Sequence, residues 1–195
     1  MNYDEEMDYR NELLLRARSR KKLTSEEQLW LASHRIINQN LGYPCLNKDI
    51  VELEKNVVYS VHVNVERLTY TDRIIPVITV PAGEGEIIAE GNLIDHNKKT
   101  TLKKSVKMLG ILIDSNHGEM DFLYQSKLGL LGVSYECDFY DELQRLTIRK
   151  NSGSPSLDFA MLRENLSENK IMYRCKIPTN DDFDSFVFSL EWNKV

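Results

Sequence analysis

The sequence has little of what would place the protein in a membrane or outside the cell. No apolar run approaches the roughly 18 to 20 residues that a membrane-spanning helix needs. The N-terminus, Met1–Glu6, is acidic and lacks the basic start and apolar stretch of a secretory signal. Cysteine occurs only at positions 45, 137 and 175, without a CxxC pair, which is typical of reduced thiols rather than a disulfide framework. We therefore expect a cytoplasmic protein that does not bind membranes.

An excess of basic charge is also missing. The 195 residues contain 25 Lys and Arg against 30 Asp and Glu, a formal net charge of −5, whereas nucleic-acid-binding domains are usually basic. Hydrophobic residues make up 42% and charged residues 28%, close to globular averages, which excludes disordered and fibrous classes. The length predicts a single domain over residues 1–195.

The first 50 residues are predicted to form a helical segment with two helices. In the charged segment 4–20 the acids precede the bases, an order that suits the helix dipole. Thr24 and Glu27 have the spacing of a capping box, and apolar residues at helical spacing follow them. Gly42 and Pro44 are the expected end of this second helix.

Residues 55–195 are predicted to form a mainly antiparallel β-sandwich on which the helices pack, which makes the fold class α+β. The evidence is alternation of apolar and polar residues in short segments joined by short turns. The clearest segments are 57–65, 131–139, 171–177 and 186–192. Phe159–Leu166 is expected to be a short helix. A jelly roll is the candidate topology, and the layout is similar to jelly-roll sugar-binding modules, a likeness of fold alone.

The histidines are the first candidates for chemistry. His62 lies in a strand, on its polar side, while His96 and His117 lie in predicted turns beside acidic residues. Those two turns flank one predicted strand of roughly 30 to 40 Å, so one compact site cannot use both. No HExxH or CxxC spacing is present, and solvated loop histidines are the expectation. Whether any of the three joins carboxylates in the folded chain is left open.

No nucleophile or phosphate-binding motif is complete. Gly132–Glu136 begins like a GxSxG elbow, but an acid stands where the second glycine is required. Cys137 and Cys175 alternate with apolar residues and are expected in the core, whereas Cys45 is expected in a loop as the reactive thiol. Gly83-Glu84-Gly85 lacks the lysine of a P-loop. The sequence thus predicts no catalytic residue, no cofactor and no metal site.

Acidic side chains form the predicted partner-binding surface. They occur at one strand end and in one turn, and turns favour aspartate for structural reasons as well. The predicted residues are Glu136, Asp138, Asp141, Glu142, Asp181, Asp182 and Asp184. A local basic run at 16–22 is interpreted as a solvated helix end.

These observations favour a non-catalytic protein-binding domain. The first hypothesis is a bacterial immunity or inhibitor protein that neutralises a basic toxin or enzyme by charge and surface complementarity. The second is a carbohydrate-binding or phage-structural sandwich, which would need solvent-facing aromatic residues. The third is a hydrolase whose residues assemble only in the folded chain. The oligomeric state and the exact strand order do not follow from the sequence.

Overall fold

The structure is a computed structural model whose contacts divide the chain into two compact units, Met1–His34 and Arg35–Val195. It describes residues 3–19, 21–34, 36–38, 45–68, 74–89, 92–95, 98–101, 104–110, 118–141, 146–152, 160–176, 182–184 and 186–195. Within these residues, no helix has both the length and the apolar character needed to cross a membrane.

The first unit is a pair of helices, α1 (Tyr3–Arg18) and α2 (Ser25–Ser33). Thr24 and Glu27 form the predicted capping box at the start of α2. The Arg16 guanidinium donates two hydrogen bonds to the Glu27 carboxylate, at 2.6 and 3.2 Å, and so ties α1 to the cap of α2. The prediction of helix up to Gly42 was wrong, because α2 ends at Ser33 and strands begin soon after it.

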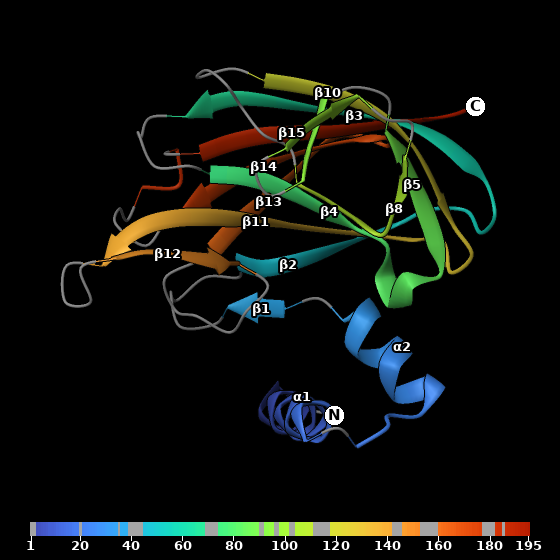
Figure 1. The fold of residues 1–195 in the computed structure, drawn as a ribbon, viewed down its shortest axis with the longest axis vertical. Helices are drawn as coiled ribbons and strands as arrows, with labels where there is room; N and C mark the ends of the chain where they lie inside the picture. Colours follow the sequence, from blue (N-terminus) through green and yellow to red (C-terminus); the bar gives the residue numbers. More distant parts are fainter. Residues whose placement is uncertain are drawn as a thin grey trace. The chain divides into compact units, whose positions relative to one another are not determined.

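The second unit is built almost entirely from β-strands (Figure 1). Their bounds are β1 Ile36–Asn38, β2 Cys45–Glu52, β3 Val58–Leu68, β4 Ile74–Thr79, β5 Gly85–Ala89, β6 Asn92–Asp95, β7 Lys98–Thr101, β8 Lys104–Val106, β9 Met108–Gly110, β10 Gly118–Ser126, β11 Leu130–Asp141, β12 Leu146–Asn151, β13 Ala160–Ser167, β14 Lys170–Lys176 and β15 Phe186–Lys194. A short 3-10 turn, η1 (Pro81–Gly83), precedes β5.

The main sheet is antiparallel and nearly closed. Its strand order is β8-β5-β10-β3-β15-β14-β13-β2-β11-β4-β9, with β1 paired to β2 and β12 paired to β11, while β6 and β7 pair with each other. The two ends of this order, β8 and β9, are separated in the chain by Lys107 alone. One continuous segment, 104–110, therefore pairs with β5 at one edge and with β4 at the other. This is a barrel-like sheet, and the predicted two-layer sandwich is not confirmed.

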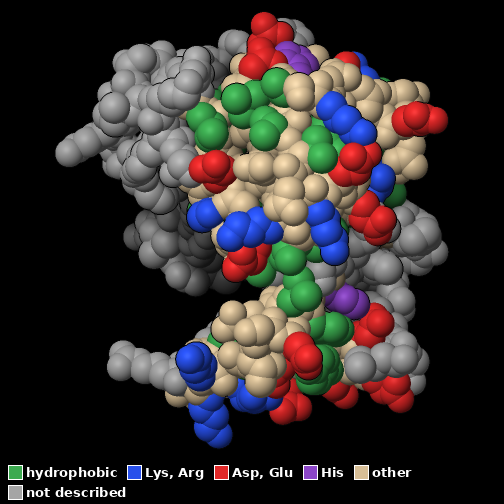
Figure 2. Space-filling view, turned by 90° about the vertical axis from the view of Figure 1, so that its right-hand side faces the viewer, with side chains coloured by type: hydrophobic (Ala, Val, Ile, Leu, Met, Phe, Trp, Pro, Cys, Tyr) green, Lys and Arg blue, Asp and Glu red, His purple; other side chains and the backbone are tan. Residues whose placement is uncertain are grey.

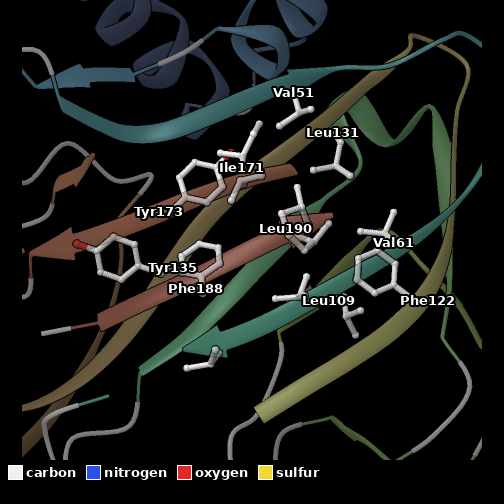
Figure 3. Close-up of a cluster of buried hydrophobic side chains, with 14 of the residues drawn as sticks. Val51, Val61, Leu109, Phe122, Leu131, Tyr135, Ile171, Tyr173, Phe188 and Leu190 are labelled. Carbon is white, nitrogen blue, oxygen red and sulfur yellow. The ribbon is translucent and has the colours of Figure 1, made fainter. Parts of the chain in front are cut away.

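Alternate side chains of the curved strands fill the interior of the sheet (Figure 3). On β15, Phe186, Phe188 and Leu190 are fully buried and alternate inward as the sequence predicted. The rings of Tyr173 and Phe188 stack with their centroids 5.0 Å apart. Because fully buried aromatic and branched side chains occupy this interior, it is a packed core, as in small barrels.

Four segments differ from the sequence predictions. The single strand predicted between the turns of His96 and His117 is divided, because 104–110 forms β8 and β9, which pair with different strands. Residues 45–50, which fall in the predicted helical segment 1–50, belong to β2, and Cys45 is buried on it rather than placed in a loop. The helix expected over Phe159–Leu166 is instead β13, which pairs with β14 along its length. Strand β10 was not predicted, although Phe122 and Tyr124 alternate inward on it. At β2 and β13, cross-strand pairing decided the conformation over local propensity.

Candidate functional site

The predicted acidic residues on β11 face away from the core. Glu136 and Asp138 alternate with the buried Tyr135 and Cys137, so their side chains occupy the outer face of the sheet and are half-buried. Asp141 is the last residue of β11. Glu142 lies outside the residues that the structure describes. These carboxylates therefore follow one strand, beside its partner β12.

Two aspartates in the acidic turn before β15 accept hydrogen bonds from within the fold. Asp182 is exposed, and its carboxylate accepts a hydrogen bond from the Asp184 backbone N–H at 2.8 Å. Asp184 in turn accepts a hydrogen bond from Arg174 Nε at 2.6 Å. Asp181 lies outside the described residues. In the strand order, β2, β13 and β14 separate β11 from β15, so the two acidic groups are not on neighbouring strands.

Two of the described histidines have carboxylate partners. One is His34, whose Nε2 lies 3.4 Å from Glu6 Oε2 in the helical unit, and the other is His62 on β3. Its Nδ1 lies 2.8 Å from Asp121 Oδ1 on β10, the residue directly opposite in the register of β3 and β10. Asp121 is three-quarters exposed, with 76% of its side chain open to solvent, so this pair lies on an open sheet face and not in a pocket. His34 stacks on Trp30 in the helical unit. His96 and His117 are outside the described residues.

Within the described residues, one concave site lies where the ends of four strands come together. It is an open pocket of about 510 Å³. Its lining residues are Val51 and Glu52 at the end of β2, Arg163, Asn165 and Ser167 on β13, Glu168, Ile171 on β14 and Trp192 on β15. Figure 2 faces the end of the sheet unit at which the C-terminus lies in Figure 1, and hydrophobic side chains are mixed there with charges of both signs. Ends of barrel-like sheets are common positions for binding pockets.

A buried ion pair with Asp49 holds Arg163, the partly buried lining residue that forms the base of this pocket. The Asp49 side chain, 0% exposed, accepts a hydrogen bond from Arg163 Nη1 at 2.9 Å and one from the Tyr173 hydroxyl at 2.8 Å. Arg163 Nε also donates to Asn165 Oδ1 at 3.0 Å. The Arg163 side chain is 24% exposed, so the guanidinium reaches the pocket while its partner carboxylate is closed off from solvent. A carboxylate in such a position needs a matching cation to be stable.

Asn169 fixes one wall of the pocket. It lies in the turn between β13 and β14, and its Nδ2 donates to the Trp192 carbonyl at 3.0 Å and to Asn193 Oδ1 at 2.9 Å. The Trp192 backbone N–H donates back to the Asn169 carbonyl at 3.0 Å, and Ser167 Oγ donates to Asn169 Oδ1 at 2.9 Å. These bonds join the turn that carries Glu168 to the strand that carries the indole.

The cysteines and the one motif-like serine belong to the folded core. All three thiols are free and buried, and burial raises the pKa of Cys45 and Cys175, which keeps both thiols protonated at neutral pH. Ser134 is buried within β11, not on a strand-to-helix turn. Among the described side chains, no three His, Cys, Asp or Glu come together in a way that could hold a metal ion.

The sequence did not point to the pocket or to the ion pair beneath it. Asp49 and Arg163 are separated by 114 residues; Asp49 was not predicted to lie in a strand, and Arg163 was predicted to lie in a helix. The signal that could have indicated the ion pair is alternation within 45–52. If this segment is taken as a strand, Asp49 lies on the same inward face as Val51, and a buried acid requires a partner. No protein-family model matches the chain, and no curated protein matches it at a significant level.

Proposed function

We propose that the chain is a non-catalytic binding protein and that the pocket at the ends of β2, β13, β14 and β15 is its binding site. The observation that carries this proposal is the held geometry of the pocket. Its base is set by the Asp49–Arg163 pair and its wall by Asn169. Side chains that are already in position lose little conformational freedom when a ligand arrives, which favours binding.

The lining of the pocket combines apolar surface with a few polar groups, as small-molecule binding sites do. Val51, Ile171 and Trp192 supply apolar surface, and a few polar groups stand among them. Its volume of about 510 Å³ falls within the roughly 300 to 1,000 Å³ of small-molecule sites. A protruding side chain or loop of a protein partner could occupy the same space.

The test compares the full-length chain with pocket variants after purification and after exposure to source lysate. Asn165→Ala combined with Glu168→Gln changes two exposed lining residues. Glu164→Gln is the matched control, because Glu164 is exposed on the same strand but does not line the pocket. We expect native mass spectrometry to find a molecule retained by the wild type and the control and lost by the double variant. Equal retention by all three would contradict the proposal.

The second candidate is the inhibitor of a basic toxin or enzyme, with the acidic side chains as its contact surface. Its support is the exposure of Asp182 and the outward position of Glu136 and Asp138. Charges of this kind act mainly on association rate and are screened by salt. The combined variant Asp182→Ser, Glu136→Gln and Asp138→Asn should bind the partner several-fold more slowly at low salt. Its association rate should also depend less on salt than that of the wild type. A partner whose association rate ignores both changes would remove this candidate.

A further inference from the structure

We propose that the ligand of this pocket is a saccharide, held with its C–H face against Trp192 and its hydroxyls on Arg163, Asn165 and the two rim carboxylates. This inference rests on the proposed binding function and names the ligand class.

The base of the pocket offers hydrogen-bond donors without a net charge. Asp49 matches the charge of Arg163, and the guanidinium uses Nη1 and Nε for Asp49 and Asn165. Nη2 makes no hydrogen bond to any residue that the structure describes, and Arg163 is partly exposed in the pocket. The fixed pair therefore presents N–H groups that a hydroxyl or ring oxygen can accept.

The rim offers acceptors. Glu52 and Glu168 are exposed lining residues, and ionised carboxylates only accept hydrogen bonds. Asn165 Nδ2 beside them can donate, and Ser167 Oγ, whose hydrogen goes to Asn169, can still accept. A ligand that satisfies this lining must accept bonds at the base and donate them at the rim, which is what a ring carrying several hydroxyls does.

The apolar wall favours a ligand with one flat, non-polar face. Trp192 is half-buried, packs against the core and lines the pocket. Its backbone N–H and C=O are both hydrogen-bonded to Asn169, which fixes the main chain, and its packing against the core limits the movement of the indole. An indole face contributes large contact area at low entropic cost, and the axial C–H groups of a pyranose can cover it.

Other ligand classes fit less of the lining. An anion would gain from the Arg163 donors but would face Glu52 and Glu168, which carry the unmatched charge of the pocket. A cation would gain from these carboxylates but would meet the guanidinium at the base. A wholly apolar ligand would remove water from all of these polar groups without replacing its hydrogen bonds. An uncharged polyol avoids each of these costs.

The experiment titrates the full-length chain, in a Trp30→Phe background, with chitobiose, cellobiose, maltose and lactose, following Trp192 emission and heat. Trp30 and Trp192 are the two tryptophans, so the change leaves emission from the pocket alone. We expect at least one disaccharide to bind with a Kd of about 1 mM or tighter and to shift the emission. Asn165→Ala and Glu168→Ala should each weaken that binding about tenfold or more, since each removes a hydrogen bond to the ligand. Glu164→Ala, at an exposed residue that does not line the pocket, should not.

Two further arms separate this inference from the proposed function. Nα-acetyl-lysine amide and inorganic phosphate are titrated in the same way. If one of these binds and the pocket variants abolish its binding, the pocket is a binding site but the saccharide assignment is overturned. If no disaccharide binds, or one binds equally to wild type and pocket variants, the assignment is likewise overturned. The retention experiment above then decides separately whether the pocket binds anything.

Discussion

The buried Asp49–Arg163 pair makes the sharpest prediction about stability. Replacing Arg163 by alanine removes the cation that this arginine supplies to a carboxylate with 0% exposure, and breaking a buried pair in this way costs about 3 to 5 kcal/mol. Asp49→Ala should cost less, because Arg163 is 24% exposed and can turn toward water. Tyr173→Phe removes one hydrogen bond to a charged group, which is worth about 1.5 to 3 kcal/mol. We therefore expect the loss to be largest for Arg163→Ala.

The measurement is urea unfolding followed by Trp192 emission in the Trp30→Phe background, so that the signal reports the sheet unit. A domain has roughly 5 to 15 kcal/mol of stability, and the larger losses should move the midpoint clearly. The double variant of Asp49 and Arg163 should lose less than the sum of the two single variants, since either change alone already breaks the pair. Glu164→Ala is the exposed control and should stay within about 0.5 kcal/mol of the wild type. If the two single variants each lose less than about 1 kcal/mol of unfolding free energy and these losses add in the double variant, the reasoning is refuted.

Three more predictions follow from burial and hydrogen bonding. Phe188→Ala should cost about 3 to 5 kcal/mol in thermal or urea unfolding and Ser189→Ala much less, because a core ring leaves a cavity; similar losses would mean that the faces of β15 are misassigned. Cys45, 1% exposed, should react with maleimide in the native protein as slowly as the other two thiols, whereas rapid labelling would contradict its burial in β2. The Thr24 backbone N–H and then Arg16 lower the pKa of Glu27, so this carboxylate stabilises the helical unit above the ordinary glutamate pKa. That contribution should be lost as the pH falls through the lowered pKa of Glu27. If the helical circular dichroism signal of Glu27→Gln falls with acid in the same way as that of the wild type, this prediction is contradicted.

Local pattern by itself determined the start of α2 and the inward faces of several strands. A capping box needs only the spacing of Thr24 and Glu27, because its hydrogen bonds close within one turn. Alternation on β3, β11, β14 and β15 gave their inward residues, because the side-chain period of a strand is two in any sheet. These features depend on neighbours in the chain, so the sequence is sufficient to predict them.

Only the tertiary structure decided how the sheet closes and where the pocket lies. Nothing local to 104–110 indicates that one side of Lys107 pairs with β5 and the other with β4, since both pairings depend on the curvature of the whole sheet. The short stretches 45–52 and 160–167 became strands because partners on either side completed their hydrogen bonds. Asp49 meets Arg163 for the same reason: a buried carboxylate requires a cation, but which of the 25 basic residues supplies it depends on strand order, and the pocket forms above that contact.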